Sequence, residues 1–224
     1  MQAMQENSRP PTLLSGFTAD QSRLILQSAE HWRLAPNSVI MYGGQRATSL
    51  FQLIEGTAKF FRVTKNGDEV LLWWLSSGDT FGIATLLAGP AQYFGTAQTI
   101  DDCELLVWNQ EIIRPLADTY GLLAQNALSI ALFYLATYAD RLVGLTTETA
   151  EQRLARTLLQ LSKRIGRVHP DGVDLAIRNE DLSGLANISA FTASRQLKKW
   201  ERQGVIRKER GKIHIFSPDS LLID

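Results

Sequence analysis

The sequence has few of the residues on which most enzymatic and metal chemistry depends. Its 224 residues include one cysteine, Cys103, and three histidines. A single cysteine excludes an internal disulfide and is compatible with a reducing cytoplasm. It also excludes an iron–sulfur cluster, which needs about four thiolates. His31 and Cys103 are the candidate haem ligands of the first half, and both are interpreted as structural. With no Ser-His-Asp, phosphate-loop or zinc-ligand spacing, the sequence predicts no enzyme and no cofactor.

Long apolar runs are also scarce. The runs Leu71–Leu75 and Phe133–Leu135 are too short to cross a membrane. The N-terminal sequence MQAMQENSRPP has no apolar signal region, so residues 1–17 are interpreted as a flexible tail. These patterns indicate a cytoplasmic protein without a membrane partner.

Net charge is absent from the chain as a whole but not from its parts. The chain has 23 basic and 23 acidic residues. Residues 1–150 contain 9 basic and 14 acidic residues, a net charge of −5, and residues 151–224 contain 14 and 9, a net charge of +5. This asymmetry suggests an anion-binding module attached to a second part.

Two short predicted helices in the basic part are joined by a tight turn. The first is Glu180–Ala186, with Asn179 as its N-cap. The turn is Asn187-Ile188-Ser189, and asparagine tolerates the left-handed backbone that such a turn needs. Ser189 then caps a second helix over residues 190–203, which has Ala193, Leu197 and Trp200 inside. The pattern is typical of a helix-turn-helix.

A basic hairpin over residues 205–216 follows the second helix, as in a winged helix-turn-helix. Between Arg195 and Lys212 there are eight basic residues and two acidic ones. Because a DNA major groove admits one helix and is flanked by phosphates, this helix and hairpin are predicted to bind duplex DNA. The predicted DNA-binding residues are Ser189, Ala190, Phe191, Thr192, Ser194, Arg195, Lys198, Lys199 and Lys212. Arg195 is expected to read guanine, whereas Phe191 either contacts a thymine methyl group or packs against the wing.

The first half is predicted to be rich in β-structure after a helix over Phe17–Trp32, with Leu24 and Ile25 on its buried side. Short strand-like runs alternate with glycine-containing turns, and Asn66-Gly67 is a strong hairpin signal. Such spacing favours a sandwich or barrel. The predicted strands cover residues 39–42, 49–54, 59–63, 69–75, 95–100 and 103–108, with a short helical segment at 83–87.

Leucines then recur at helical spacing from Glu111 to Leu145. This segment is more apolar than one domain needs to bury, which favours a dimerisation helix, and the alternative is a core helix of a monomer. A hinge is expected at Thr146-Thr147-Glu148, followed by a helix over Thr149–Lys163. The leucines concerned are Leu122, Leu123, Leu128, Leu132, Leu135, Leu142 and Leu145.

Several motifs together resemble the cyclic-AMP receptor / fumarate-nitrate regulator (CRP/FNR) superfamily. They are Leu53–Gly56, Ser77–Gly82, Glu151–Leu159, Asp181–Arg195 and Gln203–Ile206. The resemblance implies an α+β fold with a jelly-roll β-roll like those that bind cyclic nucleotides (residues 18–110). A long dimerisation helix and hinge (111–146) and a C-terminal winged helix-turn-helix (147–224) would follow. It also implies a homodimeric transcription regulator that binds a near-palindromic DNA operator. RNA polymerase would be a further partner of an activator.

The chain departs from the cyclic-nucleotide-binding members at the positions that hold the ligand. Ile83 stands where those members have the glutamate that binds the ribose, and Tyr93-Phe94 stand where an arginine and a serine or threonine hold the phosphate. Regulation independent of cyclic nucleotides is therefore expected. The roll is either filled or binds an apolar or aromatic effector, and an interaction protein with a degenerate DNA-binding module is the alternative. The candidate pocket residues are Leu72, Trp73, Trp74, Gly82, Ile83, Tyr93, Phe94 and Tyr138.

Overall fold

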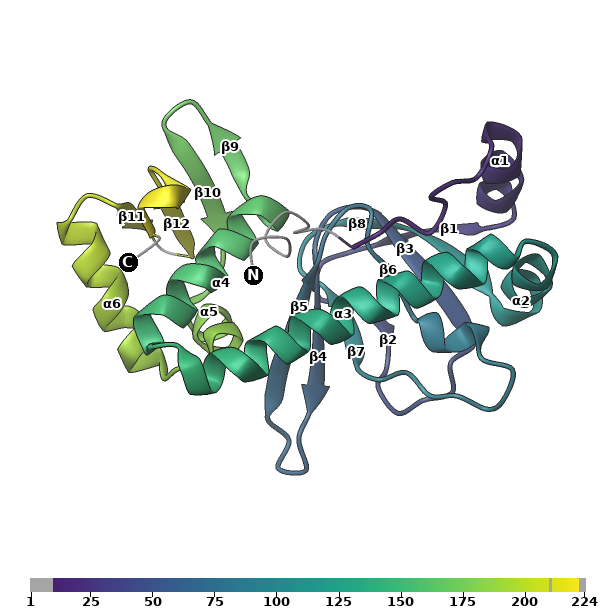
Figure 1. Ribbon diagram of the computed structural model, residues 1–224, viewed down its shortest axis with the longest axis horizontal. Helices are drawn as coiled ribbons and strands as arrows, with labels where there is room; N and C mark the ends of the chain where they lie inside the picture. Colours follow the sequence, from purple (N-terminus) through teal and green to yellow (C-terminus); the bar gives the residue numbers. More distant parts are fainter. Residues whose placement is uncertain (1–9, 210, 222–224) are drawn as a thin grey trace. The chain divides into compact units, whose positions relative to one another are not determined.

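The computed structural model describes residues 10–209 and 211–221, and the chain forms two compact units (Figure 1). The first unit is Pro10–Thr137, and the second begins at Tyr138, within the long helix α3. The elements that begin in the first unit are α1 Ala19–Gln27, β1 Glu30–Leu34, β2 Val39–Met41, β3 Ser49–Glu55, β4 Ala58–Val63, β5 Glu69–Leu75, β6 Thr80–Phe81, the 3-10 helix η1 Ile83–Leu86, β7 Thr96–Thr99, β8 Cys103–Asn109, α2 Gln110–Thr119 and α3 Gly121–Thr147. Those of the second are α4 Ala150–Ile165, β9 Arg167–His169, β10 Gly172–Ala176, α5 Asn179–Ala186, α6 Ala190–Arg202, β11 Ile206–Glu209, β12 Lys212–Ile215 and the 3-10 helix η2 Pro218–Leu221.

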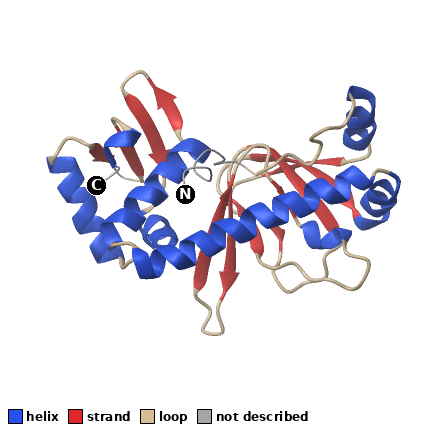
Figure 2. Ribbon diagram, in the orientation of Figure 1, coloured by secondary structure: helices blue, strands red, loops and turns tan. Residues whose placement is uncertain are grey.

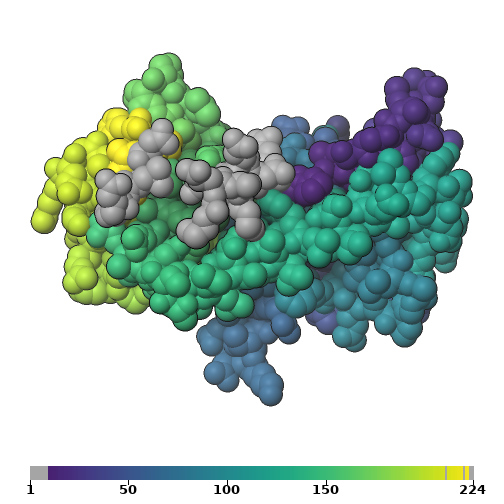
Figure 3. Space-filling view, viewed as in Figure 1, coloured from purple at the N-terminus to yellow at the C-terminus, as the bar shows by residue number. Residues whose placement is uncertain are grey.

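Two antiparallel four-stranded sheets form the predicted β-roll. Their strand orders are β1-β8-β3-β6 and β2-β7-β4-β5, and Figure 2 shows these strands in red. Gly67 has a φ of 89° in the turn between β4 and β5, which confirms the predicted hairpin. The loop of this hairpin projects from the rest of the roll in Figure 3.

The strands of the roll alternate between two apolar cores, because successive side chains of a strand point to opposite faces. Phe51 of β3 and Val107 of β8 lie in the core between the sheets. Leu50 and Trp108, one residue away, lie in a second core against the helices. The Trp108 indole Nε1 donates a hydrogen bond to the carbonyl of Ile25, at 2.8 Å.

The predicted helix over Phe17–Trp32 is wrong beyond Gln27. Helix α1 ends at Gln27, and β1 pairs with β8 from Glu30 to Leu34. Leu24 is exposed, whereas Ile25 is fully buried and Leu26 packs against the same core. The helical start has a capping box between Thr18 and Gln21. Pairing with β8, which lies 69 to 77 residues away, overrides the local pattern, and no local signal indicates it.

The expected flexible tail is wrong for its last residues. Leu13 is fully buried in the core against the helices. The Asn126 side-chain amide donates hydrogen bonds to the carbonyls of Leu13 and Ser15, both at 2.8 Å. Residues 1–9 lie outside the described residues. Burial of Leu13 and the two hydrogen bonds from Asn126 attach the segment that precedes α1 to helix α3.

The predicted helical region 111–145 is two helices, separated at Tyr120. Within α3, Leu123, Ala127 and Ile130 are buried against the roll. Most of the remaining predicted leucines are exposed, which argues against a core helix of a monomer. They are Leu128 at 59%, Leu132 at 54%, Leu135 at 63%, Leu142 at 66% and Leu145 at 40%.

By length and composition alone, α3 could cross a membrane, and no other helix of the described residues meets this test. Only 17% of its most apolar window is buried. The expectation that no apolar run approaches the length of a membrane span concerned uninterrupted runs, and α3 does not contradict it. Its apolar positions are interleaved with alanine, serine and threonine, so no long uninterrupted run signals it.

The second unit packs α4, α5 and α6 with an antiparallel sheet of order β11-β12-β10-β9. The predicted basic hairpin is β11 and β12. The hairpin of β9 and β10 has no counterpart among the predicted elements. Its turn sequence, His169-Pro170-Asp171-Gly172, is a turn signal that could have revealed it.

Candidate nucleic-acid interface

The turn between α5 and α6 has the predicted geometry. Asn187 is left-handed, with φ 50° and ψ 54°, and the Ile188 amide donates to the Ser183 carbonyl at 3.0 Å. Ser189 caps α6 by accepting a hydrogen bond from the Thr192 amide at 3.1 Å. These contacts fix the direction in which α6 leaves the turn.

The prediction that Asn179 caps α5 is wrong. Helix α5 begins at Asn179 itself, and Arg178 precedes it without a side-chain cap. The Asn179 amide Nδ2 instead donates to the Ala190 carbonyl at 3.1 Å. The first turns of both helices are thereby joined, which a sequence pattern cannot show because the partners belong to different helices.

Helix α6 has a buried face and a basic, exposed face. Ala193, Leu197 and Trp200 are buried, as predicted. Phe191 is 76% exposed, so it does not pack against the wing. The exposed face carries a depression of about 310 Å³ lined by Arg195, Lys198, Lys199, Arg202 and Gln203.

The predicted contact residues near the start of α6 differ in exposure. Ser189 and Ala190 are exposed, whereas Thr192 and Ser194 are half-buried. The Thr192 hydroxyl lies 2.8 Å from the hydroxyl of Ser189, the residue that caps α6. Thr192 therefore already has a hydrogen-bond partner within the protein.

Two of the predicted DNA-binding lysines form ion pairs within the protein. Lys199 Nζ lies 2.9 Å from Glu151 Oε1, and Lys212 Nζ lies 2.6 Å from Asp174 Oδ2. Arg195, Lys198 and Arg202 are exposed, and no hydrogen bond or ion pair holds their side chains among the described residues. Lys199 and Lys212 thus each have a charged partner within the protein.

Asp174 of β10 is the centre of a charged cluster with β9 and the wing strand β12. His214 Nδ1 lies 2.7 Å from Asp174 Oδ1, and His169 Nε2 lies 2.8 Å from Oδ2. The pKa of Asp174 is lowered to about 2, chiefly by the hydrogen bond from Lys212 and, to a smaller extent, by that from His214. The cluster joins β9, β10 and β12, so Lys212 has a structural role that the sequence did not reveal.

Aromatic side chains occupy the interior of the roll. Trp73 lies in the core between the sheets, with its ring centroid 5.2 Å from that of Tyr134. The Tyr93 hydroxyl accepts a hydrogen bond from the Ser49 amide at 2.8 Å and donates to the Ser49 carbonyl at 3.0 Å. Trp73 is therefore the member of the 73–74 pair that faces the interior.

Other predicted pocket residues lie elsewhere. Phe94 is 62% exposed, and the Arg62 guanidinium lies 5.0 Å from its ring centroid. Ile83 packs against the core on the helix side of the roll. Tyr138 belongs to the second unit, where burial raises its pKa to about 12. Within the roll, Phe94 and Ile83 therefore do not line one pocket with Trp73 and Tyr93.

Gly82, another predicted pocket residue, is required by the backbone conformation of its loop. Its φ is 77°, and a Cβ there would lie 2.7 Å from the Ser49 carbonyl oxygen. Glycine therefore permits the close approach of the loop to β3. Leu72 is half-buried on β5, one residue before Trp73.

The sequence matches two family models, a cyclic nucleotide-binding domain over residues 31–120 and a Crp-like helix-turn-helix domain over residues 152–222. It is 27% identical over 204 residues to the cyclic AMP receptor protein of Thermus thermophilus, a match that covers 91% of both chains. It is 25% identical to the nitrogen fixation regulation protein FixK of Azorhizobium caulinodans, covering 89% of this chain and 82% of that one. The structure of FixK2 from Bradyrhizobium japonicum shares the fold, with a TM-score of 0.73 at 20% identity over 86% of this chain and 95% of that one.

The chain belongs to the CRP/FNR family of DNA-binding transcription regulators. It is not an enzyme, as the sequence predicted. The predicted fold is also confirmed: a β-roll, the long helix α3 and a helix-turn-helix with a small sheet.

Proposed function

We propose that the protein acts in the cytoplasm as a homodimer on near-palindromic duplex DNA, with α6 of each protomer in one major groove. The exposed side chains of Phe191, Arg195 and Lys198 support this role for α6. The half-sites would lie about 10 bp apart, centre to centre. Arg195 would read a guanine, and Lys198 and Arg202 would contact phosphates.

The leucines of α3 support the homodimer. Leu128, Leu135 and Leu142 are exposed and lie seven residues apart, which is the heptad spacing of paired helices. A second copy of this helix would cover them. The same apolar stripe accounts for the membrane-like composition of α3 without a membrane.

We further propose that cyclic nucleotides do not control this regulator. The carrying observation is that the buried polar residues described in the roll include no lysine or arginine. They are Ser49, Ser76, Asp79, Thr80, Thr85 and Thr99. A buried phosphate needs a charge-assisted partner, and Tyr93 uses its hydroxyl to bind β3.

A filled roll fits the packing better than an apolar effector does. The rings of Phe51 and Phe81 are stacked, with centroids 5.4 Å apart, and Tyr93 lies 6.2 Å from Phe51. These rings occupy the interior that an effector would need. Regulation would then act through the amount of protein or its modification.

Calorimetric titration with cyclic AMP and cyclic GMP tests this proposal, with the cyclic AMP receptor protein of Thermus thermophilus as positive control. No heat of binding is expected, and DNA affinity should be the same with and without either nucleotide. Micromolar binding by this chain would refute the proposed independence.

A further inference from the structure

The first turn of α4 holds the recognition helix through a carboxylate. Both oxygens of Glu151 accept hydrogen bonds from Lys199 Nζ, at 2.9 and 3.2 Å. The Gln196 amide Nε2 also donates to Glu151 Oε1. Gln196 and Lys199 lie three residues apart, so their side chains share one face of α6. The single Glu151 carboxylate binds both of them.

The position of Glu151 is itself stabilised by the start of helix α4. It lies in the first turn of α4, where the helix dipole favours a negative charge. Thr149 and Gln152 form a capping box around the same turn. The Glu151 side chain is 28% exposed and that of Lys199 is 53% exposed. The acid is thus more restrained than the lysine that it binds.

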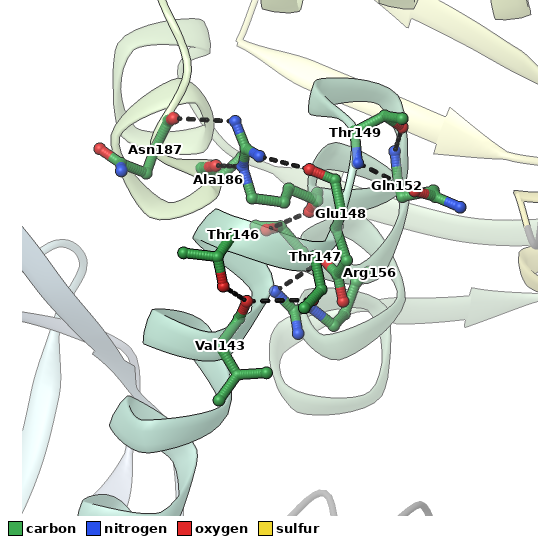
Figure 4. Close-up of polar contacts among 11 residues, drawn as sticks. Val143, Thr146, Thr147, Glu148, Thr149, Gln152, Arg156, Ala186 and Asn187 are labelled. Atoms are coloured by element: carbon green, nitrogen blue, oxygen red, sulfur yellow. Dashed lines mark hydrogen bonds and ion pairs between the residues drawn. The ribbon is translucent and has the colours of Figure 1, made fainter.

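Arg153, two residues further along α4, holds the turn that precedes α6. Its guanidinium donates to the Glu148 carbonyl at 2.8 Å and to the Ala186 carbonyl at 3.2 Å. Figure 4 shows Glu148, Ala186 and Asn187 around these contacts. The first turn of α4 therefore binds both the helix-turn-helix turn and the middle of α6.

We propose that Glu151 is a positioning residue that keeps Lys199 from the DNA phosphates. This inference rests on the proposed function of α6. Three cations of this helix, Arg195, Lys198 and Arg202, then bind the duplex, and the fourth remains with Glu151. A phosphate would have to displace a two-oxygen contact that is already formed, and the neighbouring Gln196 stabilises that contact.

Salt dependence of DNA binding separates this arrangement from a general charge effect. Each phosphate contact contributes about −0.9 to the slope of log K against log salt concentration. Glu151→Gln should release Lys199, steepen the slope by about 0.9 and raise affinity about two- to five-fold. Lys199→Gln in the wild-type chain should leave the slope unchanged. In the Glu151→Gln chain, Lys199→Gln should restore the wild-type slope.

Fluorescence anisotropy on a duplex selected from a random pool, over a series of salt concentrations, gives these slopes. Glu180→Gln is the matched control, because Glu180 is an exposed acid of the neighbouring helix α5, and it should not change the slope. Circular dichroism melting of each variant checks that it is folded. If Glu151→Gln is unfolded, Lys199→Gln alone decides, and a slope flatter by about 0.9 overturns the proposal.

The possible failures are distinguishable. If the wild-type chain shows no salt-dependent binding to duplex DNA, the proposed function fails. If it binds, and Lys199→Gln flattens the slope equally with Glu or Gln at position 151, then Lys199 contacts phosphate in either case. That result overturns the role of Glu151 and leaves the DNA-binding function intact.

Discussion

The two units of this protein place their charges in opposite ways. The roll buries small hydroxyl residues and one carboxylate, Asp79, which accepts a hydrogen bond from the Ser76 amide at 2.7 Å. The second unit buries Asp174, His214 and Arg164 and exposes cations along α6. Exposed cations are thus concentrated on α6 of the second unit, whereas the buried polar residues described in the roll include no lysine or arginine. The roll nevertheless matches a cyclic nucleotide-binding domain over residues 31–120, so the proposed independence from cyclic nucleotides rests on its individual residues and not on its fold.

Charge reversal on α6 should have the largest effect on the difference between the two units. Arg195→Glu is expected to lower DNA affinity by roughly 100-fold or more, because it removes a bidentate base contact and adds repulsion from phosphates. Fluorescence anisotropy with the selected duplex measures the loss. Lys65→Glu, an exposed reversal in the β4–β5 turn, is the control and should bind normally. Unchanged affinity of Arg195→Glu would mean that α6 is not the reading helix.

The next effect concerns the exposed leucines of α3. Leu132→Glu combined with Leu135→Glu should convert the homodimer to monomer, because two charges would be buried in an apolar seam. Light scattering gives the mass, and DNA affinity should fall by about 100-fold when the half-sites are no longer bound together. Leu87→Glu places a charge on another exposed leucine, of the roll, and should remain dimeric. A dimeric double variant would place the interface elsewhere.

A smaller effect is expected from the Asp174 cluster. Its carboxyl pKa is lowered to about 2 in the folded chain, so the stabilisation is present above the ordinary value of about 3.9 and is lost as pH falls toward 2. Asp174→Asn should lower the free energy of unfolding by about 2 kcal/mol at pH 7, and by much less near pH 2. Urea denaturation at both values measures the difference. An equal loss at both pH values would assign the effect to packing rather than to charge.

The smallest effect concerns base preference at Phe191. An exposed phenyl ring can offer a thymine methyl group only an apolar contact, so thymine should be preferred by at most about 1 kcal/mol. Selection from a random duplex pool should give one strong G·C position per half-site, set by Arg195, flanked by A·T pairs. Phe191→Ala should remove the thymine preference and leave the G·C position. Two or more required G·C pairs would show that Lys198 or the wing also reads bases.

Local patterns predicted most elements of this structure correctly. The Asn66-Gly67 turn, the Ser189 cap and the buried face of Ala193, Leu197 and Trp200 depend on neighbours in sequence, and all are confirmed. Strand β1 and the β9–β10 hairpin were missed. The first depends on pairing with distant β8, and the second is marked in the sequence by its turn residues alone.

The sequence alone determined the family, the order of the roll, the long helix and the helix-turn-helix, and the basic character of α6, because motif spacing and hydrophobic period are properties of the chain itself. Tertiary structure decided which of the predicted site residues have partners within the protein and which are exposed. Lys199 and Lys212 are held by Glu151 and Asp174, 48 and 38 positions away. Phe94 is exposed beneath Arg62, and Ile83 packs toward the helices. Each of these outcomes depends on a partner that folding brings near, so a one-dimensional pattern could name the residues but not their contacts.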